Sequence, residues 1–473
     1  MIVSLLVNTT LLHHSFVFWA VFRPSQNDRR APSETRRKRP AKDFNSTSSP
    51  STVMAHQPDT IPWHLLASNL SWVSGSDRSD LSGHACCSSD CTNLHAIRKG
   101  SERASWKFAP LMAKIIQEAS TRERAKYPAH YDPPQRDTVI VNDRIARMIE
   151  RNFDWSEAHF PMIHPNYEPP SPSTPSIRLA SAFCDPHVDW GHTEFLERHL
   201  LGYFNVQLVM CLILSGEMDT ILRACACPGV QLKTWWNGLY CSYPELHGII
   251  GWNMLYRKAL CSYIALNVAY CFPDMWDPKT RETEKKDYRN THFYQNMLRE
   301  CTACDRGSEF TFHVHQRFFG IDKRQFNAVR PILADKDHRL KDQLAFDNGW
   351  LMNFHYGLLP LEEFLILENS TLLFVPHEVD VGEVRGILAY AGKLPLELVL
   401  IIMEFADYTP RRRLKVPHDP LHPNNRAALD EYLEHCWQII VRCHMMAEAL
   451  GTYFGLSWWD EVDIQLFRLW PCL

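Results

Sequence analysis

Residues 195–214 read FLERHLLGYFNVQLVMCLIL, and their dense apolar content predicts a long buried helix that spans residues 192–214. Gly216 interrupts the pattern, which continues in helical form over residues 218–226. Residues 246–272 predict one or two further helices that are rich in Trp, Tyr and Leu. Charged residues interrupt each of these runs, and none reaches eighteen consecutive apolar positions, so we expect core helices and not membrane spans.

Two helices are expected upstream of this core. The first begins near Trp106 and ends at Pro128. Its apolar positions recur at helical spacing, at Leu111, Ile115, Ile116 and Ala119. Asn142 is expected to cap the second helix, because its side chain can accept a hydrogen bond from a backbone N–H of the first turn.

Alternation typical of strands occurs only briefly, at residues 138–141, 310–315 and 372–375. No internal repeat of 20–50 residues accompanies these patterns. The expected fold class is therefore mainly α with minor β, an irregular helical body that follows a disordered N-terminal tail.

Composition excludes several classes of protein. The 473 residues are 45 % hydrophobic and 22 % charged, which is ordinary globular usage and excludes a fully disordered or fibrous chain. A mean hydropathy of −0.28 excludes a polytopic membrane protein. The net charge of −4 gives the whole chain no general attraction to nucleic acid. Fifteen cysteines, several of them within apolar runs, favour free buried thiols and a reducing compartment.

The first 53 residues differ from the rest of the chain. They hold eight basic and three acidic residues, and residues 36–40 (RRKRP) resemble a nuclear-import cluster. Residues 1–22 carry no charged side chain, which allows a membrane anchor or a signal peptide, but polar interruptions and the missing basic start argue against both. We expect a cytoplasmic or nuclear protein, with an N-terminal membrane anchor as the alternative.

The strongest metal-like spacing lies in the middle of the chain. Two thiols of a CxxC turn and two imidazoles on one face of a strand are the ligand set of structural zinc, and the four residues are Cys301, Cys304, His313 and His315. The sequence therefore offers zinc as a cofactor, although the spacing between the two pairs matches no standard zinc finger.

A second metal hypothesis concerns non-haem iron. His187 and Asp189 imitate the first two ligands of a two-histidine-one-carboxylate triad, and His247 could supply the third. Such a site needs a β-sheet scaffold, whereas residues 192–272 are expected to be helical, so the motif lacks its usual context.

One C-terminal segment resembles a family. The run LPLELVLIIMEFA at residues 394–406, followed by Leu433, Cys436, Trp437 and Ile440, resembles the F-box-like region of uncharacterised fungal proteins. The resemblance implies a helix whose apolar stripe binds the adaptor of a cullin-type ubiquitin ligase. The implied stripe consists of Leu394, Pro395, Leu398, Ile402 and Phe405.

These patterns divide the chain into six parts. They are a basic, Ser-rich disordered tail (1–105), a helical segment (106–160), a Pro-rich linker (161–180), a Trp- and Tyr-rich helical body (181–390), an F-box-like helical module (391–450) and a C-terminal segment (451–473).

No motif fixes a reaction, so the sequence leaves open whether the chain is an enzyme, and we favour a binding protein. The expected function is that of an interaction protein, in its sharpest form an F-box-like adaptor with protein partners, without specific binding of nucleic acid or membranes. A metal-dependent enzyme or a zinc-stabilised structural protein is the alternative.

Overall fold

The computed structural model describes residues 61–73, 93–96, 104–153, 171–184, 192–236, 251–277, 287–302, 309–321, 375–390, 392–406, 408–451 and 458–469. Of these residues, 68 % are helical and 3 % lie in strands. The expectation of a mainly α fold with minor β is therefore confirmed. The description below concerns residues that follow Val53.

The described elements follow one another from α2 to α17. The principal helices are α2 (Trp63–Ala67), α3 (Ala104–Arg124), α4 (Asp143–Asn152), α5 (Pro175–Arg178), α6 (His192–Ser215), α7 (Met218–Cys225), α8 (Asn253–Tyr270), α9 (His292–Thr302), α10 (Glu309–Phe319), α14 (Glu378–Tyr390), α15 (Leu396–Phe405), α16 (Arg426–Ala449) and α17 (Trp458–Leu469). Short 3₁₀ turns connect several of them at η2 (Ala180–Phe183), η3 (Thr234–Trp236), η5 (Pro273–Met275), η7 (Tyr288–Asn290) and η8 (Pro423–Asn425).

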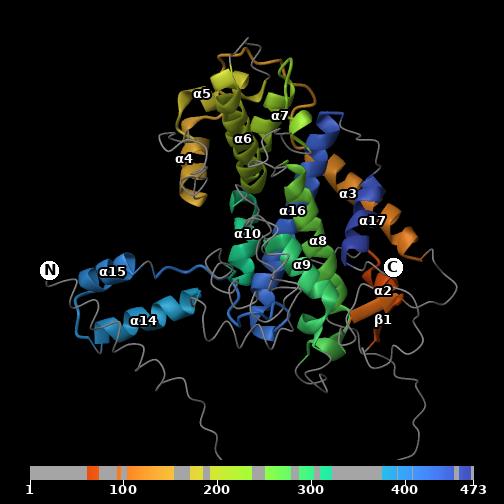
Figure 1. Cartoon of the computed structure of the whole chain (residues 1–473), viewed down its shortest axis with the longest axis vertical. Helices are drawn as coiled ribbons and strands as arrows, with labels where there is room; N and C mark the ends of the chain where they lie inside the picture. The colour runs from red at the N-terminus through yellow and green to blue at the C-terminus, as the bar shows by residue number, and fades with distance from the viewer. Residues whose placement is uncertain are drawn as a thin grey trace, which may run out of the picture. The chain divides into compact units, whose positions relative to one another are not determined.

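Helix α8 lies at the centre of the main hydrophobic core. It packs against α16, α9, α17 and α2, and the first three of these surround it in Figure 1. Sixteen of its eighteen residues are buried, as expected for a helix that is apolar on every side. Its polar side chains make internal contacts: the Asn267 amide donates to the Tyr263 carbonyl at 2.7 Å, and Arg257 pairs with Glu461 of α17 at 3.1 Å.

The helices expected from residues 192–226 are confirmed. Helix α6 ends in a turn where the N–H of Gly216 donates to Ile213 and the N–H of Glu217 donates to Leu212. This pattern is a Schellman cap, and it needs the positive φ of 78° that Gly216 adopts. The guanidinium of Arg442 in α16 donates to the carbonyls of Ile213 and Leu214 at 3.1 and 3.3 Å. The end of α6 is thereby fixed to α16.

The two upstream helices are also confirmed. Helix α3 begins close to Trp106, and the N–H of Ile145 donates to the side chain of Asn142 at 3.0 Å, which caps α4 as expected. Within the stretch expected to be disordered, however, the structure describes α2 and an antiparallel pair of strands, β1 (Leu70–Val73) and β2 (Asn93–Ala96). Trp63 of α2 contacts Phe108 and Tyr263, so the ordered chain begins before residue 106.

Two of the three expected strands differ from the structure. Residues 310–315 belong to helix α10, so the strand expected there was wrong. The burial that continues from this segment has helical spacing, since His315, Phe318 and Phe319 are buried at positions i, i+3 and i+4. At residues 138–141 the pairing is a single bridge between Val139 and Leu179. The stretch 372–375 lies outside the described residues except for Val375.

Helices α14 and α15 form a second, small core. Val381, Val399 and Met403 are its buried members, and Figure 1 shows the two helices side by side in blue. Pro376 accepts backbone hydrogen bonds from Arg411 and Arg412 at 3.0 and 3.1 Å, which connects the start of α14 to the chain that follows α15.

The two glycines with positive φ beside α7 offer a matched test of the cap. Alanine is strained at either position because both have φ near 78°. At Gly216 a methyl group would also approach Arg442 Nη2 to 2.9 Å, whereas nothing lies within 4 Å at Gly229. We expect Gly216→Ala to lower the free energy of unfolding by about 2 kcal/mol and Gly229→Ala by about 1 kcal/mol, measured by urea unfolding. Equal losses would show that Arg442 does not stabilise this end of α6.

Candidate functional site

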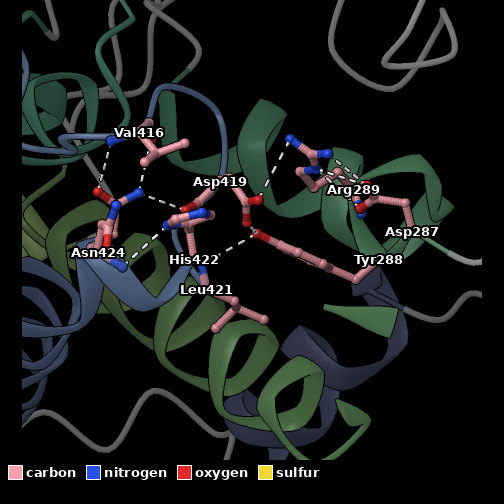
Figure 2. Close-up of polar contacts among 9 residues, drawn as sticks. Asp287, Tyr288, Arg289, Val416, Asp419, Leu421, His422 and Asn424 are labelled. Atoms are coloured by element: carbon pink, nitrogen blue, oxygen red, sulfur yellow. Dashed lines mark hydrogen bonds and ion pairs between the residues drawn. The ribbon is translucent and has the colours of Figure 1, made fainter. Parts of the chain in front are cut away.

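One polar network connects η7 with the segment before α16. Figure 2 shows Arg289 between two carboxylates: its Nη2 donates to Asp287 Oδ2 at 2.6 Å, and its Nη1 lies 3.8 Å from Asp419 Oδ2. The Tyr288 hydroxyl donates to Asp419 Oδ1 at 2.8 Å and accepts the N–H of Leu421 at 3.3 Å. Burial raises the pKa of Asp419, while the charge of Arg289 and the Tyr288 hydrogen bond oppose that rise.

Asn425 closes the same network from the start of α16. Its side-chain amide donates to the carbonyls of Val416 and Asp419 at 2.8 and 2.6 Å, and its oxygen accepts the N–H of Val416 at 2.9 Å. Beside it, His422 accepts the N–H of Asn424 at 3.1 Å (Figure 2). The network satisfies its polar groups within the chain, so its evident role is to hold residues 287–290 against residues 416–425.

A second polar cluster lies deep between α8, α9, α10 and α16. A hydrogen bond of 2.6 Å joins His315 Nδ1 to the hydroxyl of Tyr432, whose ring stacks on Phe318 with centroids 3.7 Å apart. Nearby, Ser262 Oγ and Cys301 Sγ are 2.6 Å apart. Burial, followed by the charges of Lys258 and His435, lowers the pKa of His315 to about 3. The imidazole is therefore neutral at physiological pH.

The structure brings two of the four expected zinc ligands into one cluster. Cys301 and His315 both lie in this buried cluster, where each already has a hydrogen-bond partner. His313 and His315 lie on helix α10, where two residues are about 200° apart around the axis, so the shared strand face was wrong. Cys304 lies outside the described residues. In the described part of the chain, no three His, Cys, Asp or Glu side chains are grouped to hold a metal, and zinc remains a prediction.

The iron hypothesis concerns residues that the structure does not describe. His187, Asp189 and His247 all lie outside the described residues, so their mutual placement stays a prediction.

The most unusual surface of the described chain lies on α14 and α15. Of twelve exposed large hydrophobic residues in the described ranges, nine belong to these two helices. We call this set the α14–α15 face. Its members are Val379, Ile387, Tyr390, Leu396, Leu398, Leu400, Ile401, Ile402 and Phe405. A concentration of exposed apolar side chains on one element is typical of an interaction site.

The sequence located only part of this face. Leu398, Ile402 and Phe405 were expected to be available for binding, and they are exposed by 47, 42 and 89 %. Leu394 instead packs against the small core of α14 and α15, and Pro395 precedes the first turn of α15. The exposed residues of α14 were missed, although the acidic first turn at Glu378 and Asp380 is a recognisable helix start.

The two halves of the expected F-box-like module do not share a core. Leu433, Cys436 and Ile440 lie on α16 and are completely buried in the main core. Trp437 of the same helix packs on Tyr263 of α8, with ring centroids 5.4 Å apart. The buried residues of α15 belong to the separate cluster that it forms with α14. Helix α16 is thus a central helix of the body and not the closing part of a docking module.

The buried histidine of the inner cluster gives a pH-dependent prediction. The folded chain keeps His315 neutral down to a pKa of about 3, whereas an unfolded chain protonates it below about pH 6.5. Its contribution to stability is therefore complete above pH 6.5 and is lost as the pH falls, by about 1.4 kcal/mol per unit. We expect the stability difference between wild type and His315→Gln to shrink by about 2 kcal/mol between pH 7 and pH 5, measured by urea unfolding.

The control for this experiment is His64→Gln, which replaces an exposed histidine of α2. A pH-independent difference between wild type and His315→Gln would contradict the neutral, buried imidazole.

Among the described helices, none combines the length and the apolar character that a membrane crossing requires.

Comparison with known proteins gives one result. The family model of the gramillins biosynthetic cluster protein GRA5 matches residues 64–470. No curated protein and no solved structure matches the chain. The match spans residues 394–440 together with the helical body, and it is not an F-box-like family, so the resemblance expected from the sequence was wrong. The chain belongs to the family of the gramillins biosynthetic cluster protein GRA5.

Proposed function

We propose that this chain is an accessory binding protein of a biosynthetic gene cluster, and that it docks a partner protein on the α14–α15 face. The printed description of its family supports the first part of the proposal, since it names a biosynthetic cluster. The concentration of exposed apolar residues on two adjacent helices supports the second part. This concentration is the observation that carries the proposal.

Helix α15 is apolar on nearly every side, yet only Val399 and Met403 of its ten residues are buried. These two residues are four positions apart, so they form a single narrow stripe that faces α14. A helix that is apolar all round normally lies inside a protein or an assembly. Leaving Leu400, Ile401 and Phe405 in water is costly, so a partner that covers them gains the free energy of their burial.

The charge around the face indicates what kind of partner fits. Residues 378–408 contain six acidic and two basic residues. Asp380 already pairs with Arg412 at 2.9 Å, whereas Glu383, Glu397 and Glu404 are exposed. A second copy of the same face would bring like charges together, and an anionic membrane surface would repel them. An amphipathic helix with Lys or Arg beside its apolar stripe complements both the apolar and the acidic character.

The apolar surface that a partner would bury on α15 predicts a weak to moderate affinity. Burying a Leu, Ile or Phe completely is worth about 1.5–3 kcal/mol, so each half-exposed side chain offers roughly 1 kcal/mol. Six such residues on α15 give a gross gain of about 6 kcal/mol, part of which the loss of free motion on association cancels. A Kd of 1 mM corresponds to about 4 kcal/mol and a Kd of 1 μM to about 8 kcal/mol, so with the added attraction between opposite charges we expect a Kd of about 100 μM.

Several described cysteines, such as Cys211, Cys261 and Cys443, are free and buried. Buried free thiols support the cytoplasm or the nucleus as the compartment of this binding protein, because both keep thiols reduced.

The test uses the full chain and a defined probe. The probe is a helical peptide of about 18 residues with Leu on one face and Lys on the others, and its binding is followed by fluorescence anisotropy. We expect a Kd of about 100 μM for wild type and a loss of roughly tenfold or more for the double variant Leu398→Ser, Ile402→Ser, because these side chains are one turn apart on α15. Binding should weaken at high salt.

Two controls distinguish binding at the α14–α15 face from nonspecific binding. Leu65→Ser removes a leucine of α2 that is exposed by 54 %, and it should leave the affinity unchanged. A peptide with Glu in place of Lys should bind more weakly than the basic one. Equal binding of the basic peptide to wild type and to the double variant would overturn the proposal. So would a wild-type dimer, seen by analytical ultracentrifugation, that the double variant converts to monomer.

A further inference from the structure

Two buried thiols far apart in sequence lie in direct contact. Cys184 follows η2 and Cys227 follows α7, 43 positions later. Their sulfur atoms are 3.0 Å apart, and the residues are only 3 and 4 % exposed. We infer that this pair is an oxidation site, at which peroxide converts the two thiols to a disulfide that joins η2 to the turn after α7.

The backbone around both cysteines supports this pairing. Cys184 forms an antiparallel bridge with Val230, and the N–H of Gln231 donates to the carbonyl of Phe183 at 2.8 Å. Cys227 begins a Pro-Gly turn that the N–H of Val230 closes by donating to the Cys227 carbonyl at 3.2 Å. The two chain segments are therefore held side by side by main-chain contacts, independently of the sulfur atoms.

This pair differs from the other close thiols of the described chain. Cys261 also contacts Cys301, but both lie within regular helices, α8 and α9, and Cys301 Sγ also contacts Ser262 Oγ at 2.6 Å. Cys184 and Cys227 lie just beyond the ends of η2 and α7. Side chains at such positions can move by the remaining distance of about 1 Å without displacing a helix.

The chemistry requires one oxidant, which is hydrogen peroxide. One thiolate attacks a peroxide oxygen and breaks the O–O bond, which gives a sulfenic acid and, with a proton, one water. The second sulfur then displaces the sulfenic hydroxyl, which leaves as the second water when it takes the remaining proton. Two thiols and one hydrogen peroxide thus give one disulfide and two waters.

Burial controls the rate of this reaction. Burial, and next the contact with Cys227, raises the pKa of Cys184 to about 12, so very little of it is thiolate at neutral pH. We therefore expect formation over hours and faster formation at higher pH. The product closes a loop that contains α6 and α7, and such a constraint on the unfolded chain should raise the Tm by roughly 5 °C.

Peptide mapping of the full chain tests the inference. The chain is treated with hydrogen peroxide, its remaining thiols are blocked with N-ethylmaleimide, and it is digested with trypsin without reduction. Residues 179–198 form a tryptic peptide with Cys184 as its single cysteine, whereas residues 224–233 contain both Cys225 and Cys227. We expect these two peptides to be joined, with the loss of two hydrogens, in wild type and in Cys225→Ser, but not in Cys227→Ser.

Stability measurements separate a structural effect from the bond itself. Oxidised Cys225→Ser should melt roughly 5 °C above its dithiothreitol-reduced form, whereas Cys184→Ser should melt at one temperature under both conditions. The inference would be overturned if, after prolonged oxidation, Cys184 and Cys227 both carried N-ethylmaleimide and their peptides were not joined. A peptide joined through Cys225 in wild type, and absent in Cys225→Ser, would overturn it as well.

Discussion

The fold depends on one constraint, which is that helix α8 has no side that can face water. Sixteen of its eighteen residues are buried, so other elements must cover it in every direction. Helices α16, α9, α17 and α2 do so, although they come from distant parts of the sequence. The polar groups that this burial encloses then need internal partners, and the pairing of Lys258 with Glu300 at 3.6 Å is one of them.

The same constraint separates the two parts of the described chain. Helices α8 and α15 are both apolar on nearly every side, but α8 is enclosed whereas α15 buries only Val399 and Met403. By the reasoning that explains α8, helix α15 needs a cover that no other described element supplies beyond Val399 and Met403. Exposed acidic residues around α15, such as Glu397 and Glu404, favour a partner surface that carries positive charge. This asymmetry is the physical basis for assigning a binding role to the chain.

Local sequence patterns predicted local structure well here and distant contacts poorly. Helix α6 and its Gly216 end follow from apolar density and a glycine, and Asn142 follows from capping chemistry. The aromatic run in α10 fits strand and helix alike, and in the helix that forms, Phe318 stacks on Tyr432 of the distant helix α16. The Cys184–Cys227 contact joins residues 43 positions apart, so no spacing rule could have found it.

The central claim is that another protein covers α15, and photo-crosslinking in cells that produce the chain tests it most directly. A photoreactive leucine analogue replaces Leu398, and the same analogue at the exposed Leu65 serves as control. The account predicts that position 398, but not position 65, crosslinks to a Lys- or Arg-rich amphipathic segment of a different protein, identified by the mass of the joined peptide. A joined peptide from this chain's own sequence would contradict it.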